Sequence, residues 1–204
     1  MKKIDFKKEL KHLYNPSAKE IAVVDVPEMN FLMIDGAGDP NTAQELKDAI
    51  EALYAVSYTL KFMIKKAKAI DYVVAPLEGL WWTDKPSQFF FKENKDIWKW
   101  TVMIIQPAYV TKKLFNEALK QVEKKKKLPA LSKIRFEKFH EGLSVQILYI
   151  GPYSAEVPTI EKIHNFVKEK GYKLAGKHHE IYLSDPRKTA PEKLKTILRQ
   201  SITK

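Results

Sequence analysis

The sequence contains no cysteine, and this absence removes several classes of function. Disulfide bridges, thiol nucleophiles and cysteine-ligated metal sites are all excluded. The chain also lacks an apolar run of the ~18 residues that a membrane-spanning helix needs. Its basic N-terminus leads into charged residues rather than the apolar core of a signal peptide. We therefore expect a soluble, cytoplasmic protein without a membrane partner.

Sequence motifs for nucleotide binding and for nucleophilic catalysis are also missing. The turn "GAGDP" has two glycines but no P-loop lysine, and no dinucleotide fingerprint or Ser-His-Asp set is evident. The net charge of +11 comes partly from lysine clusters such as "VEKKKK" at 122–127, which are typical of a solvated surface. Without a helix-turn-helix, zinc-finger or RNA-recognition motif, we expect no specific nucleic-acid partner. The oligomeric state is not indicated.

What the sequence does contain is ample core material, with 45% hydrophobic residues in 204. In the first half, residues 21–26 and 30–38 read as strands. A long helix follows, with Thr42 and Glu45 in capping-box spacing. Two short apolar runs, "DYVVAP" and "EGLWWT", and a strand at 100–106 complete this half.

The second half repeats this order after a helix "TKKLFNEALKQVEKKK" and a strand in "SKIRFEKFHEG". Residues 141–151 read as a strand, Ser154 as the cap of a helix that Gly171 ends, and 178–186 as another strand. Thr189 and Glu192 predict a closing helix in "TAPEKLKTIL".

The pattern predicts an α+β fold of two strand–helix–strand–strand units related by pseudo-twofold symmetry. Each unit would form an antiparallel sheet with helices on one face. If the two units pair about a pseudo-twofold axis, their helix-free faces and the neighbouring turns would line a central ligand cleft. We expect a single domain over residues 1–204, with repeats at about 20–110 and 132–202 and an N-terminal extension at 1–19.

Strand alternation divides the candidate site residues between two faces. In "HHEIYLSD", Glu180 and Tyr182 share one face, and Ile181 and Leu183 are expected beneath the helices. Glu180 and Tyr182 should therefore lie on the helix-free face. In "LEGLWW", Trp82 lies in phase with Glu78, and Trp81 must point the other way. The phase alone does not decide which tryptophan faces a cleft.

A cleft with aromatic walls and one or two carboxylates suits a flat, apolar, often cationic ligand. A metal is not expected, because His178, His179 and Glu180 diverge along a strand and no third ligand stands at a recognisable spacing. No cofactor is expected either.

The segments "GPYSAE…PTI" and "HHEIYLSDPRKTAPEKLKTILRQ" resemble the C-terminal half of GyrI-like small-molecule-binding proteins. "FLMIDGAGDPN", the long helix and "APLEGLWW" resemble the first half of the stand-alone members of that superfamily. The resemblance covers residues from about 20 to 202.

This resemblance implies a drug-like small molecule as the partner and, for the stand-alone type, a hydrolase that opens the cyclopropane ring of DNA-alkylating cyclopropanoid compounds as a detoxification. Glu180 matches the family's cleft glutamate, and Tyr153 and Glu156 fall in its "PYS" turn. These three are the candidate catalytic residues. The candidate ligand-contacting residues are Trp81, Trp82, Tyr182, Glu78, Tyr54 and Phe90. Sequestration or sensing of such compounds without chemistry, and a gyrase-directed protein interaction, stay open as alternatives.

Overall fold

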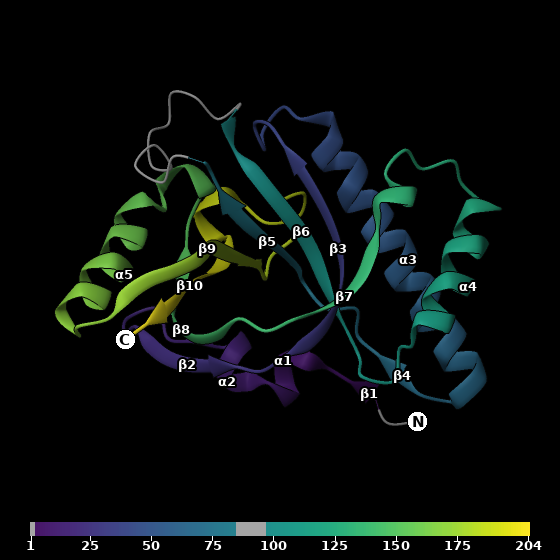
Figure 1. Cartoon of the computed structure of the whole chain (residues 1–204), viewed down its shortest axis with the longest axis horizontal. Helices are drawn as coiled ribbons and strands as arrows, with labels where there is room; N and C mark the ends of the chain where they lie inside the picture. The colour runs from purple at the N-terminus through teal and green to yellow at the C-terminus, as the bar shows by residue number, and fades with distance from the viewer. Residues whose placement is uncertain (1–2, 85–96) are drawn as a thin grey trace.

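The computed structural model describes residues 3–84 and 97–204 and has an α+β architecture (Figure 1). The helices are α1 (Phe6–Glu9), α2 (Lys11–Tyr14), α3 (Gln44–Lys68), α4 (Lys112–Glu123) and α5 (Val157–Glu169). Short 3₁₀ turns are η3 (Leu131–Lys133), η4 (Tyr153–Ala155) and η5 (Pro191–Lys193). The strands are β1 (Lys3–Ile4), β2 (Ala22–Val26), β3 (Met29–Ala37), β4 (Asp71–Tyr72), β5 (Leu77–Trp82), β6 (Lys99–Gln106), β7 (Arg135–Phe139), β8 (Gly142–Ile150), β9 (Lys173–Tyr182) and β10 (Lys195–Thr203).

Eight strands of the described residues form one antiparallel sheet in the order β2-β8-β10-β9-β5-β6-β3-β7. The two predicted units are therefore not separate sheets, because β9 of the second unit pairs with β5 of the first. Each unit also lends its leading strand to the other: β2 pairs with β8, and β7 pairs with β3. This reciprocal exchange ties the halves into one body.

The pseudo-twofold symmetry is visible in the spacing of the elements along the chain. β2 and β7 begin at residues 22 and 135, β3 and β8 at 29 and 142, and α3 and α5 at 44 and 157. All three pairs have a constant separation of 113 residues (135 − 22, 142 − 29, 157 − 44). The predicted order of strand–helix–strand–strand is confirmed in both halves.

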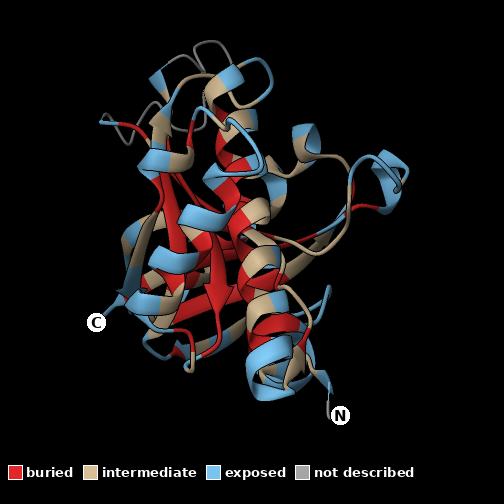
Figure 2. Cartoon of the chain, turned by 90° about the vertical axis from the view of Figure 1, so that its right-hand side faces the viewer, coloured by how far each residue is buried: buried red, intermediate tan, exposed pale blue. Residues whose placement is uncertain are grey.

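The long helices cover one face of the sheet. α5 packs Ile160, Ile163 and Val167 on β8 and β10. α3 packs on β3 and β6, where its Ser57 accepts a hydrogen bond from Gln106 at 3.2 Å. In Figure 1 the two helices stand over opposite ends of the sheet, with β5 and β9 between them. Figure 2 shows the buried residues concentrated in the strands and the inner sides of the helices.

The short N-terminal helices cover part of the opposite face. Leu13 and Tyr14 of α2 pack against Ile181 and Ile197 of the central strands. None of the described helices is both long enough and apolar enough to cross a membrane.

Three local predictions were wrong. The closing helix predicted from Thr189 is instead the turn η5 followed by β10, a central strand whose neighbours β8 and β9 supply hydrogen bonds on both sides. Sheet pairing thus overrides a weak capping signal. Ser154 lies in η4, and Glu156 is the N-cap of α5. α3 begins after Ala43 without a side-chain cap, so Thr42 does not form a capping box. The prediction that Gly171 ends α5 is confirmed, since its φ of +75° lies in the left-handed region.

Candidate functional site

The centre of the sheet carries Glu180, which is paired directly with Gly79 across the β9–β5 ladder. The register of the strand ladders in both halves makes Gly79 the pseudo-twofold counterpart of Glu180. The pseudo-twofold axis therefore passes through the Gly79–Glu180 pair. Of these two equivalent positions, only that of Glu180 bears a side chain. A Cβ on Gly79 would stand 2.7 Å from Nε1 of Trp81, so glycine is what lets the indole lie over this strand.

We call the surface that bears Glu180 the Glu180 face and the opposite one the Glu78 face. Residues paired directly in an antiparallel ladder share a face. Glu180 is paired with Leu198, which packs under α5, so the Glu180 face is the helix-bearing face. The expectation that Glu180 and Tyr182 lie on a helix-free face is therefore wrong. The alternation was right, but α3 lies on β3 and β6, and α5 lies on β8, β9 and β10, which leaves β5 between the two helices (Figure 1).

Glu180 lies beside three polar side chains, those of Trp81, Tyr182 and His178. The indole N–H of Trp81 donates to the Tyr182 hydroxyl at 3.0 Å. Burial, with the charge of Glu180 and a hydrogen bond to it, raises the pKa of Tyr182 well above its ordinary value. The phenol therefore keeps its proton. Glu180 itself is only 6% exposed, and Nε2 of His178 lies 3.4 Å from one of its carboxylate oxygens.

Tyr153 of η4 joins this cluster from the side of α5. Its ring meets the ring of Tyr182 edge to face, with centroids 5.6 Å apart. Burial, and then the negative charges of Glu180 and Glu156, raise the pKa of Tyr153 to about 12. Tyr153 is thus a neutral hydrogen-bond donor at neutral pH, placed beside an acceptor carboxylate.

Glu156 lies at the edge of the cluster. As the N-cap of α5 it occupies a position where the helix dipole favours a negative charge. Its charge also contributes to the raised pKa values of Tyr149, Tyr153 and Tyr182, which places it near all three hydroxyls. Glu156 therefore has both a structural reason for its position and proximity to the candidate site.

Tyr54 of α3 borders the cluster from the other helix. It forms a hydrogen bond with the backbone of Leu77, the residue paired with Tyr182. Burial and the neighbouring Tyr58 raise the pKa of Tyr54. Together Tyr54 and Tyr153 supply aromatic side chains from both halves of the chain, on either side of Tyr182.

The remaining predicted residues lie elsewhere. Trp82 and Glu78 are on the Glu78 face, so the structure separates the two adjacent tryptophans and associates Trp81 with Glu180. Phe90 lies outside the described residues. Within residues 3–84 and 97–204, no group of three or more His, Asp or Glu side chains is arranged to hold a metal ion.

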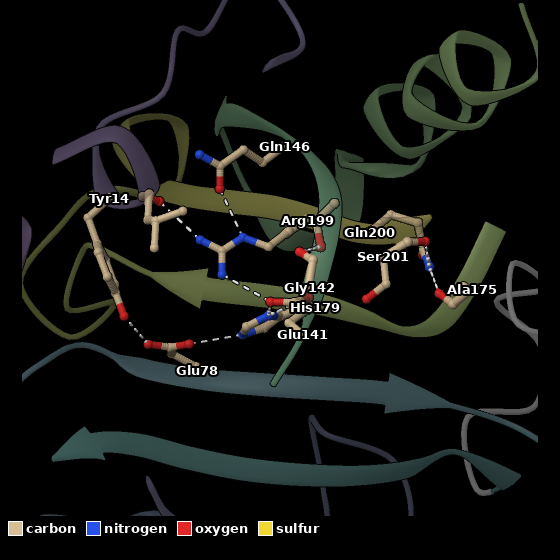
Figure 3. A network of polar contacts seen from close by, with 12 residues as sticks. Tyr14, Glu78, Glu141, Gly142, Gln146, Ala175, His179, Arg199, Gln200 and Ser201 are labelled. Atoms are coloured by element: carbon tan, nitrogen blue, oxygen red, sulfur yellow. Dashed lines mark hydrogen bonds and ion pairs between the residues drawn. The ribbon is translucent and has the colours of Figure 1, made fainter. Parts of the chain in front are cut away.

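Glu78 belongs to a second polar cluster, which is buried and fully paired (Figure 3). One of its oxygens accepts from the Tyr14 hydroxyl at 2.7 Å, and the other lies 3.0 Å from Nε2 of His179. Nδ1 of His179 lies 2.9 Å from Glu141, which also accepts from Arg199 at 3.1 Å. The carboxylates of Glu78 and Glu141 thus face two cations, His179 and Arg199, so the cluster is neutral overall. It lies on the opposite side of the sheet from Glu180, because His179 directly precedes Glu180 in β9.

This buried network attaches the N-terminal segment to the sheet. Arg199 donates to the carbonyl of Leu13 at 3.1 Å, and Gln146 donates to that of His12 at 2.9 Å. Arg199 was not predicted as part of a buried network, because the residues directly before it, 189–198, were predicted to form a helix. The β-branched residues Thr196, Ile197, Ile202 and Thr203 were a signal that favours a strand here.

Comparison with known proteins gives a consistent family and fold. The model of the GyrI-like small molecule binding domain matches residues 19–199. No curated protein sequence matches the chain significantly. Among solved structures, an uncharacterized conserved protein from Listeria innocua is 42% identical with a TM-score of 0.90, covering 98% of this chain and 100% of that one. A hydrolase from Listeria innocua is 42% identical with a TM-score of 0.89, covering 99% and 100%. The EcmrR C-terminal domain, at 12% identity, 91% and 98% coverage and a TM-score of 0.56, shares the fold alone.

Proposed function

Because the chain belongs to the GyrI-like small molecule binding domain family, we propose that it binds flat aromatic small molecules at the Glu180 face. We further propose that it hydrolyses the cyclopropane ring of cyclopropanoid DNA-alkylating compounds, as a detoxification. The Listeria innocua relative described as a hydrolase supports an enzymatic role. The observation that carries the proposal is a buried carboxylate, Glu180, beside two protonated phenols and an indole.

The proposed site lies between α3 and α5, over the β5–β9 centre of the sheet. The Trp81 indole, 5% exposed, lies at the base of this site, and Tyr54, Tyr153 and Tyr182 add aromatic edges. Aromatic side chains favour offset stacking or edge-to-face contact with a planar ligand. Such a surface accepts many ring systems, which suits a protein that meets varied aromatic compounds.

In the proposed reaction, the Glu180 carboxylate accepts a proton from a water molecule as the water oxygen attacks a cyclopropane carbon. A carbon–carbon bond of the strained ring breaks, and its electron pair moves into the conjugated carbonyl, which becomes a phenolate. Tyr153 donates a hydrogen bond to that oxygen as negative charge develops on it, and the oxygen then takes up one proton from solvent. Glu180 later returns its proton to solvent. Because ring strain already lowers the barrier, acid–base assistance of ~10²–10⁴-fold is enough.

The test is to incubate the purified protein with a duocarmycin-type compound and to follow the gain of one water molecule by mass spectrometry. Glu180→Gln keeps the size of the side chain but cannot accept the proton, so turnover should fall by ~10²–10⁴-fold. Glu192→Gln, at an exposed position in η5, is the matched control and should act like the wild type. Equal turnover by wild type and Glu180→Gln would remove Glu180 from the reaction.

The second candidate function is binding without chemistry, as in sequestration or drug sensing. The family's description as a small-molecule-binding domain favours it. In that case the compound would quench tryptophan fluorescence and be recovered unchanged. Absence of the water adduct together with saturable quenching would select this function over the hydrolase.

A further inference from the structure

The Glu78 face holds a cavity of about 440 Å³ that is separate from the Glu180 cluster. Strands β7, β3, β6, β5 and β9 all contribute to its walls. Apolar side chains line much of it: Met33, Leu80, Trp82 and Phe139. Met33 and Leu80 are only 5% and 4% exposed, so they form its floor. Because Trp81 and Trp82 point to opposite faces, a molecule in this cavity would not contact the Glu180 cluster.

Within the described part of the chain, two of the three cations that line the cavity, Arg135 and Lys99, form ion pairs with nearby carboxylates. Arg135 is paired with Asp35 and with Glu137. Lys99, another cation of the wall, is paired with Asp84 at 2.7 Å. These ion pairs leave little net charge at their own positions.

Lys177 differs from these cations. Its Nζ lies 3.3 Å from the centre of the Trp82 ring. No carboxylate of the described residues lies within ion-pair distance of it. Burial, together with the positive charge of Arg135 and against the attraction of Asp35, lowers the pKa of Lys177. The shift comes mainly from the loss of solvation on burial, and an anion bound beside the ammonium group would offset that loss.

We propose that this cavity is a second binding site, specific for small planar aromatic carboxylates. The carboxylate would pair with Lys177, and the ring would lie against Trp82 and Leu80. A half-buried ammonium group on an indole, above an apolar floor, matches a ligand that carries one negative charge on a flat hydrocarbon.

An aromatic cation fits the same cavity poorly. The only carboxylate in its wall is that of Asp35, among the residues the structure describes. Arg135 neutralises this carboxylate, which also accepts a hydrogen bond from the Thr101 hydroxyl at 2.6 Å. A cationic ligand would have to compete with Arg135 for this carboxylate and would be repelled by Lys177.

The test uses 2-naphthoate as the probe and its neutral amide, 2-naphthamide, as the matched ligand, both measured by isothermal titration calorimetry. We expect 2-naphthoate to bind with a dissociation constant on the order of 0.1–1 mM, ordinary for a ligand of this size. The amide should bind at least about 10-fold more weakly, because it lacks the charge that Lys177 recognises.

Variants locate the site. Lys177→Met should weaken binding of 2-naphthoate by about 10- to 100-fold, and Lys177→Arg should retain it. The control is Lys170→Met, since Lys170 also lies over a ring, that of Phe166 at 5.8 Å, but is the C-cap of α5 and does not line the cavity. Circular dichroism melts would verify that all three variants fold.

Three results would overturn the proposal. They are no binding of 2-naphthoate, equal affinity for acid and amide, or unchanged affinity in Lys177→Met. Loss of 2-naphthoate binding in Trp81→Leu but not in Trp82→Leu would likewise refute it, by assigning the ligand to the Glu180 face. Hydrolysis of a cyclopropanoid compound is measured separately, so failure of either proposal leaves the other intact.

Discussion

Replacement of Glu141 by glutamine tests whether the buried network behind Glu180 holds the fold together. The Glu141 side chain is 1% exposed and contacts both His179 and Arg199. Glu141→Gln preserves its size but removes its charge, so two buried cations would share the single carboxylate of Glu78. Removal of one partner from a buried ion pair costs about 3–5 kcal/mol, and we expect the free energy of unfolding to fall by that amount.

Urea denaturation of the wild type and the variant measures this difference. The control is Glu137→Gln on β7, where the glutamate side chain is 52% exposed and pairs with Arg135 at 3.1 Å. Because exposed pairs contribute little, the control should lose less than about 1 kcal/mol. If Glu141→Gln lost no more than the control, the network would not be a main source of stability.

The same network predicts a pH dependence. Burial opposes a charged imidazole, but Glu141 and Glu78 outweigh it and raise the pKa of His179 to about 9. The stability that the charged His179 contributes is fully present below its ordinary pKa of 6.5 and is lost as the pH rises through 9. Burial also opposes a charged Glu141, but His179 and Arg199 outweigh it and lower its pKa to about 2. The stability that the charged Glu141 contributes is fully present above its ordinary pKa of 4.5 and is lost as the pH falls toward 2.

Stability of the wild type should therefore be greatest between about pH 4.5 and 6.5 and decline on both sides. In Glu141→Gln the acid decline should shrink, because the titrating carboxylate is gone. The alkaline decline should also shrink, because His179 has lost one of its two partners. Identical pH profiles in the two proteins would contradict the assigned charges.

Three further predictions concern the Glu180 face. Trp81→Leu should weaken binding of an aromatic cyclopropanoid compound by about 10-fold or more, whereas Trp82→Leu should leave it within about 3-fold, as measured by calorimetry; equal effects would refute the division of faces. Gly79→Val should destabilise the protein by about 1–3 kcal/mol in urea, because its Cβ would displace the Trp81 indole; an unchanged midpoint would show that the indole moves freely. Tyr153→Phe should lower turnover more than it lowers affinity, because its hydroxyl acts on charge that develops during the reaction; a loss confined to affinity would make Tyr153 a binding residue only.

Much of the fold follows from local sequence pattern. β3, β6, β8 and α3 were predicted to within a few residues, because apolar periodicity marks them clearly. β10 was not predicted, because the capping-box spacing of Thr189 and Glu192 suggested a helix. What makes it a strand is its position between β8 and β9, a long-range condition that no local window contains.

The candidate site could be predicted only in part. Alternation correctly separated Trp81 from Trp82 and grouped Glu180 with Tyr182. It could not choose the face, because that depends on where α3 and α5 stand on the sheet. Glu78 is in phase with Trp82, yet its carboxylate is occupied by Tyr14 and His179, partners 64 and 101 residues away. Such pairings are set by strand register and by the return of the N-terminal segment to the sheet.

A crystal structure of the protein after incubation with a duocarmycin-type compound would test the proposed function most directly. We expect the opened ring system between α3 and α5, in contact with Trp81, with the newly added hydroxyl oxygen within hydrogen-bond distance of Glu180. A compound bound on the Glu78 face or on the outer surface, with the Glu180 cluster empty, would contradict it.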